Sequence, residues 1–197
     1  MRVEYTRHEF GTPGHTRHSI EVPDRKGSWM LTHTGVRYYP LDPRPSEVSI
    51  IDIAHSLAMQ CRYGGHCRDF YSVAEHSVYV SRLVPPQHAL VALLHDATEA
   101  YVSDVPRPLK PYLTNYDEIE ELNWEAISAA LRVSMFVPAC VHEVDTLICL
   151  TEMKRLMPGV DPAIEGAAPD VHIACLYPRD AEALFLARFA ELTQRRS

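Results

Sequence analysis

The sequence lacks three features that would place it in well-known classes: a basic surplus, a long apolar run and a disulfide framework. Its 197 residues include 19 Lys and Arg against 26 Asp and Glu, which gives a formal net charge of −7 at pH 7. We therefore expect no sequence-independent binding to duplex nucleic acid. No apolar run approaches the roughly 18 residues that span a bilayer, so we also expect no membrane association. A small anionic ligand is compatible with this charge, because a few local arginines are enough to bind one.

Cysteine is sparse and poorly placed for structural roles. The five cysteines are scattered along the chain, and no two of them form a CxxC pair. An odd, scattered set argues against a disulfide framework and is typical of proteins in a reducing compartment. The N-terminus is polar and rich in His and Arg, without the apolar segment of a secretory signal. These features predict a cytoplasmic protein.

The sequence does contain enough apolar residues for one well-packed domain. Hydrophobic residues make up 46% of the chain and charged residues 23%, which fits a single globular domain with an ample core. Residues 1–27 are polar and punctuated by Gly and Pro, so we expect an irregular N-terminal arm. The loose spacing of its histidines His8, His15 and His18 favours a solvated segment over a metal cluster. We place the single domain at 28–197.

The first part of this domain has the pattern of a β-hairpin. Residues 28–39 carry aromatic and β-branched residues on both sides of Thr34-Gly35, a dipeptide that suits a hairpin turn. Residues 40–45 contain three prolines and predict an extended connector.

The remainder of the domain has helical patterns. We expect a helical core over 49–156, with Ser49 and Ser72 as N-caps and Glu75 completing a capping box with Ser72. Apolar residues at helical spacing predict later helices at about 116–131, 138–156 and 179–194. The predicted fold class is therefore all-α, a single helical bundle with a small N-terminal β-hairpin.

The most informative stretch runs from Pro86 to Pro106. Its first part, 89–94, is apolar on every face, so as a helix it would be buried on every side. His95 and Asp96 follow with no break in the pattern, which predicts one continuous helix. A bare carboxylate on a buried helix costs several kcal/mol unless it is paired or bound to metal. A divalent cation would neutralise Asp96, and the alternative is a structural histidine beside an ordinary buried ion pair.

Two further residues of the same chemical types lie on inward helical faces. His76 shares a face with Val73 and Val80, a position where a histidine alone is more often structural. Asp145 belongs to an apolar stripe at i, i+4, i+7 and i+11 that comprises Val141, Asp145, Ile148 and Glu152. An acid in such a stripe requires a partner. The order H…HD…D over three helices therefore predicts one divalent ion (Co, Mn, Zn, Fe, Ni or Mg) bound by His76, His95, Asp96 and Asp145.

We expect one metal ion rather than two. A second ion would require more histidines between Asp96 and Asp145, and His142 is the only one there. Two imidazoles and two carboxylates suit a single divalent ion and leave coordination positions for water and a phosphate oxygen. We interpret His142 as incidental.

The ligand order resembles the HD superfamily of metal-dependent phosphohydrolases over about 50–156. The matching motifs are Glu75-His76-Ser77, the segment Leu94-His95-Asp96-Ala97-Thr98-Glu99-Ala100 followed by Asp104, and Val144-Asp145. Within the superfamily the sequence is most similar to bacterial 5′-deoxyribonucleotidases and to phage relatives that hydrolyse deoxyadenosine triphosphate.

This resemblance implies an HD-domain bundle and roles for several residues. It implies that Glu99 and Asp104 serve the attacking water and the leaving group. It also implies an arginine upstream of the first histidine that grips phosphate, for which Arg62, fourteen residues before His76, is the candidate. A homo-oligomer is expected from the same resemblance.

Other residues of the 62–70 loop are candidates for substrate contacts. Arg68 and His66 could bind phosphate, although a solvated charge and a structural loop histidine are the alternatives. Tyr63, beside Arg62, could stack on the base, and a half-buried aromatic without that role is the alternative.

The sequence therefore predicts a divalent-metal-dependent phosphohydrolase that cleaves phosphate from deoxyribonucleotides, a small-molecule substrate. One alternative is a deoxynucleoside triphosphohydrolase that releases tripolyphosphate. Another is a non-catalytic module that senses nucleotides, against which the presence of both Glu99 and Asp104 argues, since binding alone needs neither.

Overall fold

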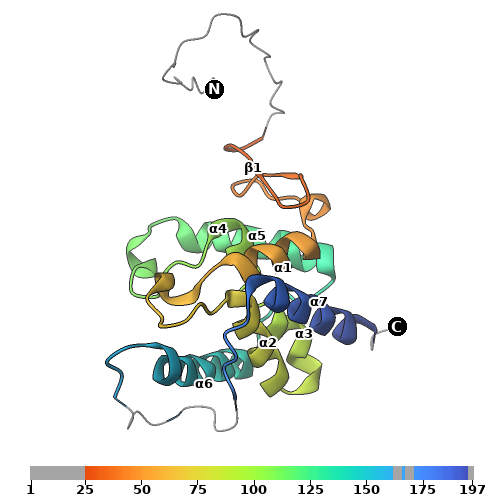
Figure 1. Cartoon of the computed structure of the whole chain (residues 1–197). Helices are drawn as coiled ribbons and strands as arrows, with labels where there is room; N and C mark the ends of the chain where they lie inside the picture. Colours follow the sequence, from red (N-terminus) through yellow and green to blue (C-terminus); the bar gives the residue numbers. More distant parts are fainter. Residues whose placement is uncertain (1–24, 162–165, 167–170, 195–197) are drawn as a thin grey trace, which may run out of the picture.

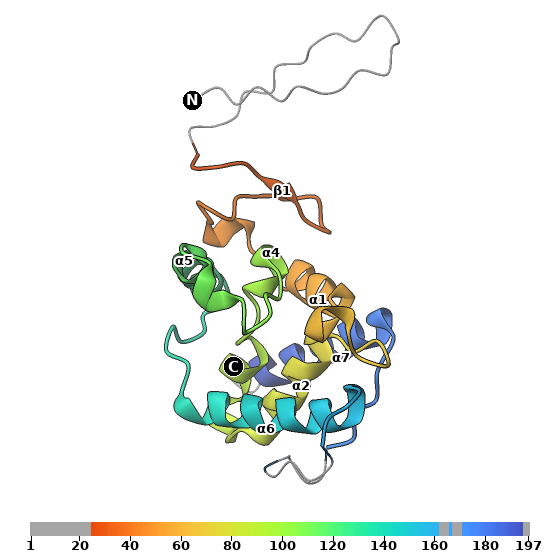
Figure 2. The same ribbon diagram turned by 90° about the vertical axis from the view of Figure 1, so that its left-hand side faces the viewer.

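A computed structural model describes residues 25–161, 166 and 171–194, and it is mostly helical with one small hairpin (Figures 1 and 2). Most of the expected N-terminal arm, with its three histidines, lies outside the described residues. No helix in these ranges is long and apolar enough to cross a membrane. The strands are β1 (Met30–Leu31) and β2 (Arg37–Tyr38), and the α-helices are α1 (Ile50–Met59), α2 (Val73–Leu83), α3 (Ala89–Leu93), α4 (Glu99–Val102), α5 (Tyr116–Leu131), α6 (Ala139–Leu156) and α7 (Pro178–Gln194).

Helix α2 lies at the centre of the bundle. It packs against α1, α3, α6 and α7, and eight of its eleven residues are buried. In both views α6 lies at the end of the molecule opposite the hairpin, with α2 between them (Figures 1 and 2). The predicted all-α bundle is thus confirmed, and its central helix is the one that carries His76.

The predicted hairpin is present but short. Strands β1 and β2 pair antiparallel with Met30 opposite Tyr38, and Gly35 supplies the positive φ of 84° that the turn requires. Tyr38 fastens the hairpin to the helices, because its ring stacks on Tyr101 at 3.7 Å between centroids and its hydroxyl donates to Asn123 Oδ1 at 2.6 Å. Tyr38 therefore belongs to the domain core, whereas Met30, Leu31 and Arg37 remain exposed.

The two predicted serine caps are confirmed, and the predicted capping box is wrong. Ser49 and Ser72 each accept a backbone N–H of the first turn. The Glu75 side chain turns away from Ser72 and accepts the backbone N–H groups of residues 174–176 at 2.8–3.1 Å. Three charge-assisted hydrogen bonds in a fully buried site outweigh the one available from the cap. Glu75 therefore fixes the segment that leads into α7.

The predicted continuous helix through His95 and Asp96 is also wrong. Helix α3 ends at Leu93, five turn residues follow, and α4 begins at Glu99. The backbone N–H of Leu94 is shared between two carbonyls of α3, which tightens the last turn. No Gly or Pro marks the break, and Leu94, Ala97 and Thr98 on its two sides are buried, so the apolar pattern alone could not reveal it. His95 and Asp96 project from this turn.

Candidate metal centre

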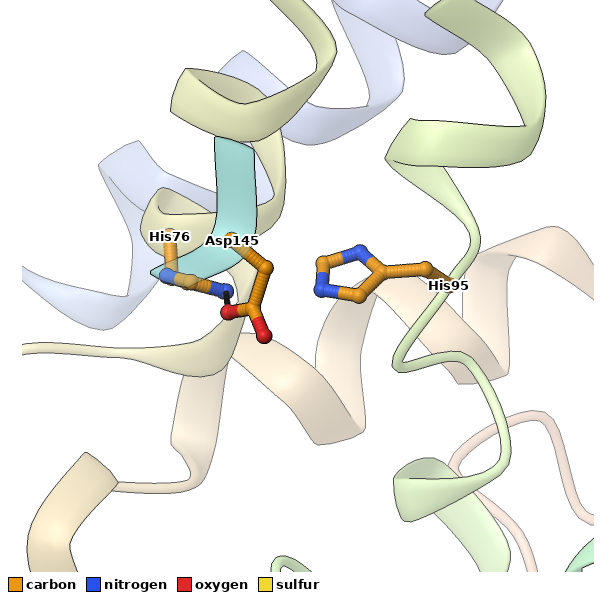
Figure 3. Close-up of side chains that lie close together, drawn as sticks. All are labelled: His76, His95 and Asp145. Atoms are coloured by element: carbon orange, nitrogen blue, oxygen red, sulfur yellow. Dashed lines mark ion pairs between the residues drawn. The ribbon is translucent and has the colours of Figure 1, made fainter. Parts of the chain in front are cut away.

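Three side chains from separate elements lie close together beside the turn between α3 and α4. His76 comes from α2, His95 from the turn after α3, and Asp145 from α6 (Figure 3). One ligand atom from each residue lies within 4.8 Å of the other two. The His76 side chain is fully buried, and those of His95 and Asp145 are 8% and 17% exposed. The group could hold a metal ion, and His95 and Asp145 are its partly exposed members.

Asp96, the fourth predicted ligand, borders the same space. Its Oδ1 lies 3.3 Å from His95 Nε2, and its Oδ2 lies 3.6 Å from His76 Nε2. All four predicted ligands are therefore near one point, with Asp96 beside the tight group formed by the other three.

Both histidines use Nδ1 for a hydrogen bond to the protein, which leaves Nε2 as the nitrogen for a metal. His95 Nδ1 donates to the carbonyl of Ala92 at 2.7 Å, and His76 Nδ1 donates to Glu152 Oε1 at 2.6 Å. Each ring therefore directs Nε2 into the site. Both Nε2 atoms are buried, and neither makes a hydrogen bond in the described part of the chain. Each faces a carboxylate, because His76 Nε2 lies 3.2 Å from Asp145 Oδ1 and His95 Nε2 lies 3.3 Å from Asp96 Oδ1. Two buried imidazole nitrogens that face two carboxylates form a donor set that fits a cation.

The charge balance of the site also fits a cation. Burial and the charge of Arg62 disfavour a charged His76, but Glu152 and Asp145 outweigh them and raise its pKa to about 9. Burial opposes ionisation of Asp145, yet the ion pair with His76 brings its pKa well below the usual range. Burial lowers the pKa of His95. The nearby carboxylates therefore favour a proton on His76, and a divalent ion would take the place of that proton.

The structure brings Arg62 and Tyr63 to this site. The Arg62 side chain is 11% exposed, and its Nη1 lies 3.6 Å from Asp96 Oδ2. Its Nε donates to Glu152 Oε2 at 3.2 Å. The hydroxyl of Tyr63 donates to the same oxygen at 2.6 Å. Both residues belong to a short 3-10 turn, Arg62–Gly65.

Arg68 and His66, from the same loop, are not brought to the metal group. Both residues are exposed, and neither side chain makes a hydrogen bond or ion pair within residues 25–161 or 171–194. Their predicted role in binding phosphate has no support from their positions.

Glu99 and Asp104 follow the turn between α3 and α4 in the sequence. Glu99 begins α4, is buried, and its Oε2 has no partner among the described residues. Its pKa is raised well above the usual range by burial and by the charges of Asp96 and Asp104. Burial also raises the pKa of Asp104. The side chain of Gln60 ties the two together, because it donates to the Glu99 carbonyl and accepts the N–H of Asp104. Carboxyl groups with raised pKa values beside a candidate metal site are suited to proton transfer.

The residue that sequence analysis left without a role is Glu152. It was placed on the inward stripe of α6, two turns after Asp145, and that position was the available signal. Its partners could not be inferred, because they come from residues far away in the sequence, including Tyr71, whose hydroxyl donates to Glu152 Oε1 at 2.8 Å.

Two relatives are similar to this chain over most of their length. The uncharacterized protein YfdR of Escherichia coli is 37% identical over 180 residues, which cover 86% of this chain and 98% of the relative. An uncharacterized protein of Rhodobacter capsulatus is 36% identical over 145 residues, which cover 66% of this chain and 74% of the relative. No family model matches the chain.

Proposed function

The chain belongs to the family of the Escherichia coli protein YfdR, and we propose that it is a divalent-metal-dependent phosphohydrolase acting on deoxyribonucleotides. The observation that carries this proposal is the convergence of the buried Nε2 atoms of His76 and His95, neither of which makes a hydrogen bond in the described part of the chain, with the carboxylates of Asp145 and Asp96. The resemblance of the ligand order to HD phosphohydrolases supports the same reading.

His76, His95 and Asp145, with Asp96 beside them, would hold the ion. Bound there, a divalent ion would lower the pKa of a water molecule and offset the negative charge of a phosphoryl group. The remaining chemistry belongs to the protein.

Glu99 and Asp104 would supply the proton transfers. A carboxyl group with a raised pKa retains or accepts a proton near neutral pH, which is the property of a general acid or base. Both residues lie close enough to Asp96 for its charge to raise their pKa values. We assign Glu99 to the attacking water and Asp104 to the leaving group.

Arg62 would bind the substrate phosphate. Its guanidinium is oriented by Glu152 and lies at the edge of the metal group. A planar guanidinium can donate two parallel hydrogen bonds to a phosphate. We propose Tyr63 as the neighbouring surface for the base, and we assign no phosphate contact to Arg68 or His66.

The reaction products test the proposal and separate it from its two rivals. The full-length chain loaded with Mn²⁺ or Co²⁺ should release inorganic phosphate from a deoxynucleoside monophosphate. Release of tripolyphosphate from a deoxynucleoside triphosphate, without phosphate from the monophosphate, would replace it with a triphosphohydrolase. Nucleotide binding without turnover of either would indicate a sensing module.

The resemblance to HD phosphohydrolases also leads us to propose a homo-oligomer, and the scattered cysteines lead us to propose a cytoplasmic location. Light scattering on the purified chain at several concentrations would measure its mass, and a mass of 22.3 kDa, that of one chain, at every concentration would contradict this part of the proposal.

A further inference from the structure

Glu152 is a buried acid beside the metal group that the proposed reaction does not use directly. Its side chain has no exposed surface. A buried carboxylate is costly unless both of its oxygens are well paired. The partners of each oxygen therefore indicate what this residue holds in place.

One oxygen of Glu152 serves the metal group. Oε1 accepts a hydrogen bond from His76 Nδ1 at 2.6 Å and a second from the Tyr71 hydroxyl at 2.8 Å. The first bond fixes the tautomer and the orientation of the His76 ring, and the second fixes the oxygen. Acceptors of this kind determine how well a histidine presents its other nitrogen to a metal.

The other oxygen serves the substrate side. Oε2 accepts a hydrogen bond from the Tyr63 hydroxyl at 2.6 Å and another from Arg62 Nε at 3.2 Å. The backbone of Tyr63 has a φ of 58°, a left-handed conformation that non-glycine residues rarely adopt and that surrounding contacts must hold. Glu152 supplies such a contact and orients the arginine next to it.

We propose that Glu152 is a positioning residue that joins two parts of the site. Its Oε1 orients the metal group (His76, His95 and Asp145) through His76, and its Oε2 orients the phosphate-binding turn (Arg62–Gly65). This inference rests on the proposed function, because it assigns a role within the same site. The inference predicts two separate effects. Loss of a hydrogen bond at Oε1 should weaken metal binding, and loss of a hydrogen bond at Oε2 should weaken substrate binding while the metal stays bound.

The first test titrates the metal-free full-length chain with Mn²⁺ by calorimetry, without nucleotide. Glu152→Gln keeps the shape of the side chain and removes its charge, and it should bind Mn²⁺ about 10–100-fold more weakly, the usual cost of losing such a contact. Glu143→Gln is the matched control, because Glu143 is exposed on the same helix and should bind like the unchanged chain.

Two conservative variants separate the two oxygens and remain informative if Glu152→Gln fails to fold. Tyr71→Phe removes a donor from Oε1 and should weaken Mn²⁺ binding several-fold. Tyr63→Phe removes a hydrogen-bond donor from Oε2 but keeps the ring. It should raise the KM for a deoxynucleoside monophosphate at saturating Mn²⁺, and its Mn²⁺ affinity should stay within twofold of that of the unchanged chain.

The outcomes distinguish this inference from the proposed function. If the unchanged chain binds Mn²⁺ and folded Glu152→Gln binds it equally well, the inference is overturned and the metal site stands. If Glu152→Gln does not fold, an unchanged Mn²⁺ affinity of Tyr71→Phe overturns it. If the unchanged chain binds no divalent ion, the proposed function fails and the inference fails with it.

Discussion

At the scale of single residues, the hydrogen bonds that the side chains of the site already make determine which of their atoms can bind a ligand. His76 and His95 each use Nδ1 for a fixed protein acceptor, so only Nε2 remains for a ligand. Glu99 has an oxygen without a partner in the described part of the molecule. Arg62 is a largely buried cation beside these groups. The roles proposed for these residues can be tested one substitution at a time.

Glu99 and Asp104 are predicted to move protons without binding the metal. Glu99→Gln and Asp104→Asn each remove a titrating carboxyl group with little change of shape. Turnover should fall by about 10²–10⁴-fold, the usual contribution of general acid–base catalysis, while metal content stays at that of the unchanged chain. Steady-state kinetics with elemental analysis would measure both. Turnover at the parent rate in either variant would assign that residue a structural role.

Arg62 is predicted to bind the substrate phosphate. Arg62→Ala removes a charge-assisted contact, so kcat/KM should fall by an amount equivalent to about 1.5–3 kcal/mol of transition-state stabilisation. Arg68→Ala is the comparison, because Arg68 is exposed on the same loop and should lose much less. If the two variants show the opposite pattern, the phosphate contact belongs to Arg68.

At the scale of elements, much of the fold could be predicted because local patterns and tertiary packing agree. Helices α5, α6 and α7 begin and end within one residue of the predicted ranges, since no Gly or Pro interrupts any of them after its first residue. The break between α3 and α4 could not be predicted, because it is buried on both sides and carries no breaking residue. Capping signals located Ser72 but not the partners of Glu75, which lie about 100 residues away.

The same contrast holds for the candidate site. His76, Asp96 and Asp145 could be singled out because polar groups on inward faces are conspicuous in a sequence. The bonds of Glu152 to Tyr63, Tyr71 and His76 depend on how α6 crosses α2, which no local pattern specifies. The candidate metal ligands could be predicted from the sequence, and the hydrogen-bond partners that orient them could not.

Glu75 is predicted to anchor the segment before α7. Glu75→Gln replaces a carboxylate that accepts three backbone N–H groups with an amide that has one accepting oxygen. Because hydrogen bonds to a charged group contribute about 1.5–3 kcal/mol, the free energy of unfolding should fall by at least about 1.5 kcal/mol. Urea denaturation would measure this change against Glu143→Gln, an exposed control on α6. Equal stability of the two variants would show that the anchor contributes nothing.

At the scale of the whole molecule, the fold brings three distant segments to one point and leaves their charges to be balanced. Helices α2 and α6 and the turn after α3 each contribute one member of the group. In the metal-free protein a proton on His76 provides the balance, because nearby carboxylates raise its pKa to about 9. Global stability should therefore respond to pH and to metal.

The stability of the metal-free protein is predicted to fall as pH rises from 6.5 to 9. The pKa of His76 is higher in the folded state, about 9, than the 6.5 or so of an unfolded histidine. Its contribution to stability is therefore complete below pH 6.5 and is lost as pH rises through 9. Denaturation of the chelator-treated chain across this range would show the decline. His76→Gln should show a flatter profile, and an equal slope would assign the decline to another group.

The measurement that tests the central claim most directly is the metal content of the purified chain. Elemental analysis after equilibration with a divalent transition ion and gel filtration should give close to one ion per chain. His95→Ala and Asp145→Ala should each lose it, and His142→Ala, which alters an exposed histidine one turn before Asp145, should retain it. A chain without metal, or full metal content in both His95→Ala and Asp145→Ala, would contradict the account.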